Sequence, residues 1–343
     1  MNFDVSRLKD MAHALGLSTS TVSKALRDSY EISPKTKQMV VDYAKSINYK
    51  PNTIARSLRQ GKTMTIGIVV STVDNHFFSQ VISGIESIAV SKGYKIIITQ
   101  THESAVKEMS NIWHLKDGAV DGLIISLSTE TTDVGYLKQL QKQDLPVVLF
   151  DRVTDDIKTH KVVVDNYMGA YEATKHLLER GRSRIAHITS SNTSSISKER
   201  LAGYKYALKE SGVPFNEGYV KFCLHGGRDL TEIQRGLDEL FSEPVKPDAI
   251  FTASDRITTT TLMQLNKMQI AIPDEIALIG FTNTILADLL SPSLSTIVQP
   301  AFDIGRKAIE MLIEILESRA TFDDFKTVVL PAQLFIRNST GKS

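Results

Sequence analysis

The chain has 343 residues, 42% of them hydrophobic, with 40 Lys and Arg against 39 Asp and Glu. This composition is typical of a globular protein and excludes a long disordered chain, while a single cysteine excludes a disulfide-stapled secreted scaffold. Hydropathy shows no apolar run of about eighteen residues, the length that a membrane helix needs, and residues 1–20 hold no apolar signal run. We therefore expect a cytoplasmic protein with no membrane partner.

Charge is distributed unevenly along the chain. Residues 1–62 hold eleven Lys and Arg against five acids, a net charge of +6, whereas the rest of the chain carries −5. A concentrated positive head on a mildly acidic body is typical of a domain that binds phosphates. Accidental clustering on a solvated surface is the alternative, and the helix pattern described next argues against it.

The head has the apolar spacing of two short helices joined by a tight turn. The first helix carries an apolar stripe at i, i+3, i+4 and i+7: Leu8, Met11, Ala12 and Leu15. Gly16 breaks this helix, and Ser18 can cap a second one. That second helix turns Val22, Ala25 and Leu26 inward. Its outward positions carry short hydrogen-bonding side chains and two cations: Thr19, Ser20, Ser23, Lys24 and Arg27.

Together with Ser18 and Thr21, these outward side chains have the chemistry of a helix that reads base edges in a DNA groove. A third helix starts at Ser33 and Pro34, and its expected buried face is Met39, Val40, Tyr43, Ala44 and Ile47. Asn48-Tyr49-Lys50-Pro51 ends it, because the residue before a proline is pushed out of the helical region. The pattern predicts a helix-turn-helix DNA-binding domain over residues 1–50.

Residues 51–62 form a separate short segment. Residues 52–59 contain good helix formers but make only about two turns, too few for a helix that is stable alone in water. An ordinary linker would contain Gly, Ser and Pro throughout. We interpret 51–62 as a hinge helix and linker that folds when the head binds DNA.

From Lys62 onward the pattern alternates between strands and helices. Apolar strand-like runs occur at 64–70, 94–99, 120–126, 146–150, 161–164, 184–189, 248–253 and 277–280. Such alternation favours parallel sheets covered by helices on both faces. Nearly 280 residues exceed what one such sheet usually needs, so we expect two lobes.

Ligands of open α/β sheets bind beyond the carboxyl ends of the strands. The residues expected there form a polar set with two arginines, several carboxylates and aromatic rings: 74–78, Asp151, Arg152, Asp165, Asn166, Arg200, Ser254, Asp255, Phe281, Thr282 and Asn283. Planar donors that hold hydroxyls and a ring that covers an apolar side suit a hydroxylated small molecule.

Other chemistry finds little support. No GxGxxG follows the first strand, and the chain has no GxxxxGK[ST] and no HExxH, while Cys223 lies in an apolar run. We expect no catalytic residues, no metal and no cofactor. Two alternatives stay open: an extracytoplasmic sugar-binding protein and an α/β enzyme with an accessory head. The missing signal run and the single cysteine argue against the first, and the missing nucleophile–base pair argues against the second.

Two strings carry a specific resemblance, LSTSTVSKAL at 17–26 and NYKPNTIARSL at 48–58. They resemble the head and hinge of the LacI/GalR family of bacterial transcriptional repressors. The resemblance continues through the body at IGIVV (66–70), VDGLI (120–124), PVVLFDR (146–152), RLAGY (200–204), PDAIF (247–251) and VQP (298–300). It covers essentially the whole chain.

The resemblance implies an all-α helix-turn-helix head and a two-lobed body like the type I periplasmic-binding proteins, with parallel sheets and three crossovers. We expect the effector-binding and dimerisation body over 63–340. Its first lobe is expected at about 63–163 and 293–322, and its second at about 164–290 and 325–340.

The resemblance also implies roles in DNA binding. Thr19 and Ser20 would read base edges, and Lys24 stands where many members carry arginine, which removes a bidentate fork. Leu58 matches the hinge leucine that is wedged into the minor groove, with Ala55 beside it. Asn52 and Arg56 would flank this wedge.

In the body, Phe77, Asp165 and Arg200 match positions that family members use to hold effectors. Thr282 stands where the family commonly has an aspartate, so either the ligand differs from a simple sugar or Asn283 and Asp255 take over. The expected effector site comprises Asn75, Phe77, Arg152, Asp165, Arg200, Asp255 and Thr282.

The expected function is that of a ligand-responsive repressor. A homodimer would bind a palindromic double-stranded DNA operator, one head to each half-site. A small molecule, expected to be a sugar or sugar derivative, would bind in the cleft between the lobes and change the affinity for the operator, in either direction.

Overall fold

The computed structural model describes residues 8–47, 49, 62–191, 194–318 and 324–341. The chain divides into two compact units, Met1–Thr63 and Met64–Ser343, which we call the head and the body and describe separately. Within the described residues, no helix is long and apolar enough to cross a membrane.

The head contains three helices, α1 (Leu8–Ala14), α2 (Thr19–Ala25) and α3 (Pro34–Ser46). The side chain of Ser18 caps α2 by accepting a hydrogen bond of 3.0 Å from the Thr21 amide. Ser33 caps α3 by accepting one of 3.2 Å from Thr36. Their common core is closed by six buried side chains, Met11, Ala12, Val22, Ala25, Val40 and Ala44.

One residue of the expected core is exposed. Met39 has 43% of its surface accessible, although it was expected on the buried face of α3. Val40 and Ala44, four residues apart, form the centre of that face, and Tyr43 and Ile47 lie half-buried beside them. Met39 lies just outside this stripe and faces solvent, because a short helix packed against two others buries only a narrow face.

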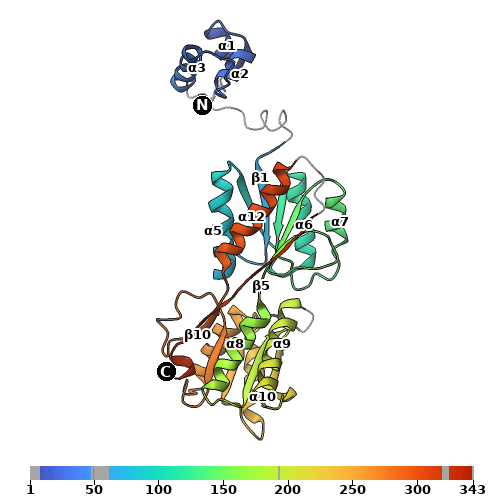
Figure 1. The fold of residues 1–343 in the computed structure, drawn as a ribbon, viewed down its shortest axis with the longest axis vertical. Coiled ribbons are helices and arrows are strands. Elements are labelled where there is room, and N and C mark those ends of the chain that lie inside the picture. Colours follow the sequence, from blue (N-terminus) through green and yellow to red (C-terminus); the bar gives the residue numbers. More distant parts are fainter. Residues whose placement is uncertain (1–7, 48, 50–61, 192–193, 319–323, 342–343) are drawn as a thin grey trace. The chain divides into compact units, whose positions relative to one another are not determined.

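The first sheet of the body has six parallel strands in the order β11-β5-β4-β3-β1-β2. Their bounds are β1 Thr65–Val70, β2 Lys95–Gln100, β3 Gly122–Ile125, β4 Val147–Phe150, β5 His160–Val164 and β11 Thr327–Leu330. Helices α5 (His76–Ser91) and α12 (Ala301–Glu317) cover one face, and α6 (Ala105–Asp117) and α7 (Gly135–Gln141) cover the other (Figure 1).

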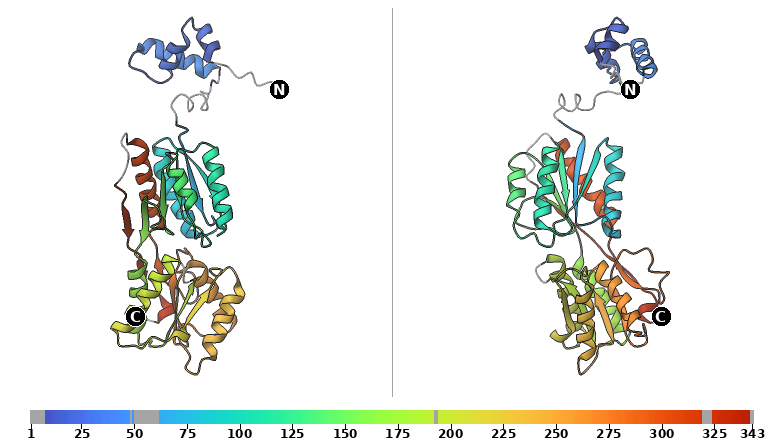
Figure 2. Two further views of the ribbon diagram at one scale, coloured as in Figure 1. Left: turned by 90° about the vertical axis from the view of Figure 1, so that its right-hand side faces the viewer. Right: turned by 180° about the vertical axis from the view of Figure 1, so that it is seen from behind.

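The second sheet repeats this plan in the order β12-β10-β9-β8-β6-β7, with β12 antiparallel to β10. Its strands are β6 Ile185–Ser190, β7 Val220–Cys223, β8 Ala249–Thr252, β9 Ala277–Phe281, β10 Ser295–Val298 and β12 Gln333–Phe335. Helices α8 (Asn166–Glu179) and α9 (Ser195–Glu210) form one layer, and α10 (Leu230–Ser242) and α11 (Asp255–Lys267) the other. Short 3₁₀ helices occur at Glu217–Tyr219 and Asn338–Thr340. Figure 2 shows the layers of both lobes, and the expected fold class is confirmed.

The chain crosses between the lobes at different places from those expected. Segment 293–322 was assigned to the first lobe, but β10 pairs with β9 in the second sheet. Segment 325–340 was assigned to the second lobe, but β11 pairs with β5 in the first. The crossovers therefore follow β5, β10 and β11, because the elements that come next, α8, α12 and β12, belong to the other lobe. Strands β7, β10, β11 and β12 were not predicted; β7, β11 and β12 are partly exposed and have only short apolar runs, that of β7 being interrupted by Lys221.

A close crossing of α5 and α12 stabilises the first lobe. A Cβ added at Gly305 would lie 2.0 Å from the carbonyl oxygen of Val81, and one at Gly84 would lie 2.1 Å from that of Phe302. Glycine on each helix lets the two backbones touch, so these positions accept no larger residue without moving a helix.

Candidate functional site: the interlobe pocket and the surface of helix α2

Helix α2 exposes the short polar side chains that the sequence assigned to DNA. Thr19 and Ser20, at its first two positions, are exposed. The hydroxyl groups of Ser18 and Thr21 lie 2.9 Å apart and are engaged with each other. Lys24 forms an ion pair with Glu31, so this cation has to leave a carboxylate before it can bind a base or phosphate.

The remaining positions assigned to DNA divide into two groups. Ser23 accepts a hydrogen bond of 3.3 Å from Arg27, which also binds its backbone carbonyl at 3.0 Å. The hinge residues Asn52, Ala55, Arg56 and Leu58 lie outside the described residues.

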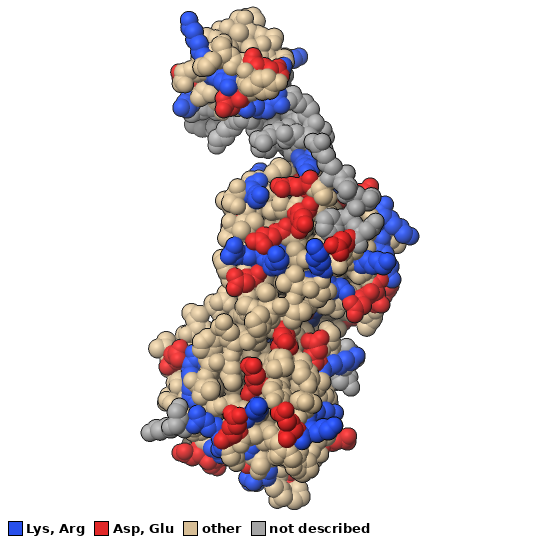
Figure 3. Space-filling model, in the orientation of Figure 1, with Lys and Arg blue, Asp and Glu red and all other residues tan. Residues whose placement is uncertain are grey.

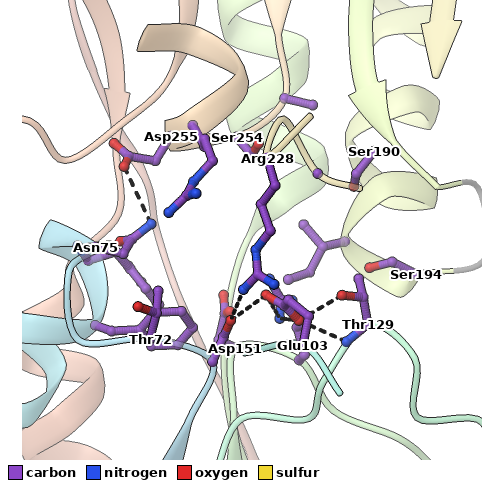
Figure 4. Close-up of a pocket in the computed structure, with 18 of the residues that line it drawn as sticks. Thr72, Asn75, Glu103, Thr129, Asp151, Ser190, Ser194, Arg228, Ser254 and Asp255 are labelled. Carbon is purple, nitrogen blue, oxygen red and sulfur yellow. Dashed lines mark hydrogen bonds and ion pairs between the residues drawn. The ribbon is translucent and has the colours of Figure 1, made fainter. Parts of the chain in front are cut away.

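In the body, one pocket lies at the carboxyl ends of the strands of both sheets (Figure 4). Five of the seven residues assigned to an effector line it, Asn75, Phe77, Arg152, Arg200 and Asp255. The first lobe also contributes Ser71, Thr72, Phe78, Glu103, Thr129 and Asp151, and the second contributes Ser190, Ser194, Ile196, His225, Gly226, Arg228, Ala253, Ser254 and Arg256, with Gln299 at a crossover.

On the first lobe, Arg152 is held by Glu103, whose two carboxylate oxygens accept several hydrogen bonds. Nη1 of Arg152 donates to both oxygens of Glu103, at 2.9 and 2.7 Å. Glu103 also accepts from the hydroxyl of Ser71 at 2.6 Å and from the amide and hydroxyl of Thr129 at 2.9 and 2.6 Å. Burial alone would raise the pKa of Glu103, but Arg152 and these hydrogen bonds outweigh it and lower the pKa to about 2. Glu103 therefore positions Arg152 and has no oxygen to spare for a ligand.

On the second lobe, Arg200 is fixed by three contacts. It is only 3% exposed, and its guanidinium carbon lies 3.5 Å from the centroid of the Phe281 ring. Its Nε donates to the Asn166 side chain at 2.9 Å, and its Nη1 donates to the carbonyl of Ala253. Burial lowers the pKa of Arg200 to about 9, against the opposing effect of Asp151 and Glu199, so the group is still charged at neutral pH. Its position is set before any ligand arrives.

Two of the residues assigned to an effector do not line the pocket. Asp165 caps α8 by accepting a hydrogen bond of 2.9 Å from the Met168 amide. Thr282 is buried and donates its hydroxyl to Asp255, which lines the pocket. Both therefore support elements or residues of the site.

Hydrogen bonds join the two lobes around the pocket. Nδ2 of Asn75 donates to Asp255 at 3.4 Å, the bond drawn in Figure 4. Gln80 of α5 accepts from Asn283 at 2.9 Å. Arg228 reaches from the second lobe to the His102 carbonyl, at 2.6 Å, in the first. Closure of the lobes is thus held by a few polar contacts, which a ligand in the pocket can strengthen or replace.

Three charged residues of the pocket were not predicted from the sequence, Glu103, Arg228 and Arg256. Arg256 lies one position beyond the residues that were named after β8. Glu103 follows β2, and the same rule that identified Arg152 after β4 would have identified it. Arg228 follows β7, a strand that the apolar pattern did not reveal.

The face of the body shown in Figure 3 has no large patch of charges of one sign. Figure 3 shows acidic and basic side chains interspersed over the body. Among the described residues, no three His, Cys, Asp or Glu side chains come together as metal ligands would.

A helix-turn-helix unit followed by a two-lobed body with a ligand-sized interlobe pocket defines a class of protein, the DNA-binding regulators with a periplasmic-binding-protein-like body. Residues 7–52 match the model of the "Bacterial regulatory proteins, lacI family", and residues 174–340 match that of the "Periplasmic binding protein-like domain". The chain belongs to the lacI family of bacterial regulatory proteins.

Relatives match over nearly the full length. The chain is 30% identical to the HTH-type transcriptional repressor PurR of Vibrio campbellii, over 98% of this chain and 99% of the relative. It is 28% identical to catabolite control protein A of Priestia megaterium, over 96% and 98%. The crystal structure of the lac repressor dimer bound to operator and the anti-inducer ONPF has the same fold, with a TM-score of 0.84 at 21% identity, over 98% of this chain and 99% of that chain. The relatives are transcriptional regulators, which fits a protein that is not an enzyme.

Proposed function

We propose that this protein is a dimeric repressor whose affinity for a palindromic operator is set by a small molecule bound between the lobes. The observation that carries the proposal is the pocket itself. Both lobes line it, and direct hydrogen bonds such as that of Asn75 to Asp255 join the lobes around it. A ligand there contacts both lobes at once and changes the free energy of their closure, which is the requirement for coupling to a distant site.

Operator recognition is assigned to α2 and the hinge. The exposed hydroxyls of Thr19 and Ser20 at the start of α2 suit base edges, and Lys24, released from Glu31, suits a guanine or a phosphate. Asn52, Ala55, Arg56 and Leu58 are proposed to enter the minor groove, with Leu58 as the apolar wedge.

A second copy of the chain is proposed to cover the free edges of the two sheets. The edge strand of the first sheet, β2, exposes Ile97 and Ile98, and that of the second, β7, exposes Phe222 and is followed by Leu224, which is 65% exposed. Exposed apolar edge strands are rarely left uncovered in stable proteins. The same edge in each lobe thus supports one continuous two-fold interface.

The effector is proposed to be a sugar or sugar derivative. Arg200 and Asn75 offer planar donors, Asp255 offers a carboxylate acceptor and Phe77 offers an apolar ring, the groups that hydroxyl-rich ligands use. Asp165 and Thr282 would act through the elements that they fix. A relative of known structure was solved as a complex of the transcriptional regulator CelR with cellobiose, a likeness that supports the fold alone at 24% identity.

The deciding experiment selects DNA fragments bound by the full-length protein from its own genome, with and without a panel of sugars and sugar derivatives. A recovered palindrome whose affinity one compound changes about 5–150-fold supports the proposal. The lack of any enriched sequence under all conditions contradicts it.

Two variants then test the roles of the pocket and of the hinge separately. Arg200→Lys keeps the charge but loses the planar fork and the stacking on Phe281, so the response to the compound should disappear while operator binding remains. Leu58→Ala should weaken operator binding far more than binding to random DNA. An unchanged response in the first variant would remove Arg200 from the site, and equal losses on both DNAs in the second would remove the wedge.

A further inference from the structure

Arg228 is an exposed residue of the pocket lining that is held by a tight glycine turn. It follows Gly226 and Gly227, which have φ values of 61° and 82°. A Cβ at Gly227 would lie 3.1 Å from a side-chain carbon of Ile257 and 3.2 Å from its amide nitrogen, so this turn is pressed against the first turn of α11. The turn directs an exposed arginine out of the second lobe and across the cleft, as Figure 4 shows.

Its partners are uncharged. The guanidinium donates to the His102 carbonyl at 2.6 Å and to the Ser71 hydroxyl at 3.3 Å, and it forms no ion pair with any of the described residues. Two of the other three arginines of the pocket face carboxylates: Arg152 pairs with Glu103 at 2.7 Å, and Arg256 lies 3.7 Å from Asp74. The third, Arg200, is buried and held by Asn166, the Ala253 carbonyl and the Phe281 ring.

The carboxylates near the pocket are engaged with groups other than Arg228. Glu103 pairs with Arg152, Asp74 lies 3.7 Å from Arg256, and Asp255 accepts hydrogen bonds from Asn75 and Thr282. Arg228 is therefore the exposed arginine of the lining that no carboxylate of the described residues contacts. A hydroxylated ligand without charge gives this cation nothing better than the two neutral acceptors it already has.

The first-lobe segment that meets Arg228 has an unusual backbone. His102 and Glu103 both have left-handed φ values, 51° and 68°. Such conformations are unfavourable for residues other than glycine and cluster at ligand clamps. Here they turn the His102 carbonyl toward the cleft while Glu103 turns toward Arg152. The segment therefore provides an uncharged acceptor for the arginine.

We propose that the effector carries an oxyanion, a carboxylate or a phosphate, and that Arg228 binds it and thereby selects acidic sugar derivatives over neutral sugars. The guanidinium exchanges two neutral acceptors for a charged one, and charge-assisted hydrogen bonds are roughly twice as strong as neutral ones. The proposal rests on the effector role of the pocket and adds the charge of the ligand and the residue that reads it.

The test measures binding to the full-length protein by calorimetry, using glucose, glucuronate, glucose monophosphate and inorganic phosphate at constant ionic strength. We expect at least one acidic hexose to bind about tenfold or more tightly than glucose, the scale of a single charge-assisted contact. Glucuronate and glucose monophosphate distinguish a carboxylate from a phosphate. Arg228→Ala should abolish the preference, Arg228→Lys should keep part of it, and Arg235→Ala, an exposed arginine of α10, should leave it intact.

Three results would overturn the inference: glucose binding as tightly as its acidic forms, a preference that survives in Arg228→Ala, or no saturable binding of any of the anions. Operator binding is measured in parallel, so that the two proposals can fail separately. If a neutral sugar changes operator affinity equally in the wild type and in Arg228→Ala, the repressor proposal stands and the role of Arg228 is wrong. If anions bind in a way that depends on Arg228 but operator affinity does not change, the role of Arg228 stands and the repressor proposal is wrong.

Discussion

Arg152 and Glu103 lie 49 positions apart and meet in the pocket, where Nη1 of the arginine spans both carboxylate oxygens at 2.9 and 2.7 Å. The pair ties the end of β4 to the turn after β2. Because Ser71 and Thr129 also donate to Glu103, one carboxylate joins the loops that follow four neighbouring strands of the first sheet. The floor of the pocket is therefore assembled around Glu103.

Glu103→Gln tests this arrangement. The pKa of Glu103 is lowered to about 2 from an ordinary 4.5, so the carboxylate should contribute about 3 kcal/mol to the free energy of unfolding at pH 7. The contribution is complete above pH 4.5 and is lost as the pH falls toward 2, so the two proteins should converge there. Urea unfolding at pH 7 and pH 4 measures the gap, with the half-exposed Glu310→Gln as control. A gap independent of pH would show that the charge of Glu103 is not what matters.

His187 predicts a second dependence on pH. Its ring lies between Tyr204 and Phe251, at 5.1 and 4.6 Å between centroids, and burial lowers its pKa to about 3. The unfolded chain binds a proton below pH 6.5 and the folded chain does not, so stability should fall by about 1.4 kcal/mol per pH unit from 6.5 toward 3.

His187→Phe should remove about that much of the slope between pH 6 and 4 in urea unfolding. The exposed His114→Gln should leave the slope unchanged. A wild-type slope that survives in His187→Phe would assign the proton uptake to other groups.

The crossing of α5 and α12 predicts a steric effect. In Gly305→Ala the new methyl would meet the Val81 carbonyl, and the helices would have to separate at a cost of about 1–3 kcal/mol. Gly236→Ala on α10 is the matched control, because its nearest neighbour is the Lys221 Cβ at an ordinary 3.4 Å. There alanine should stabilise the helix by up to about 1 kcal/mol. Equal effects of the two changes would contradict the close contact.

The cap of α2 predicts a local effect in the head. Ser18→Ala removes the acceptor for the Thr21 amide and should destabilise the head by about 1 kcal/mol. Hydrogen exchange at the first turn of α2 in the full chain would report the change as roughly a fivefold loss of protection. Ser46→Ala, which loses only a hydroxyl bond to the Tyr43 carbonyl near the end of α3, should alter exchange little. Unchanged protection in Ser18→Ala would mean that the cap does not limit opening.

Much of this architecture could be predicted from local signals. The helix caps at Ser18 and Ser33 could be predicted because each cap residue and its hydrogen-bond partner lie only three positions apart in the sequence. The eight predicted strands could be recognised because each contains a run of apolar residues, as parallel strands covered on both faces usually do. Strands β7 and β11 were not predicted, because Lys221 interrupts the apolar run of β7 and the short run of β11 ends at Pro331.

The site was predictable to the extent that strand ends determine it. Asn75 and Asp255 were found because each follows a strand and begins a helix. The partnership of Arg152 with Glu103 was not, because an ion pair between distant loops leaves no trace in spacing. Thr282 does not line the pocket, because its hydroxyl is bound to Asp255, which lines the pocket in its place. The sequence gives no sign of this contact between distant residues.

The order of the strands has a consequence for synthesis. Strand β11 closes the first sheet, yet the ribosome makes Thr327–Leu330 only after nearly the whole second lobe. Helix α12, which covers the first sheet, is also translated late. Domains usually fold in the order in which they leave the ribosome, but here the lobe that begins first must wait until the end. A chain interrupted near residue 290 therefore presents an unfinished first lobe, with the apolar face meant for α12 uncovered, and is a substrate for chaperones or proteases instead of a partly working regulator.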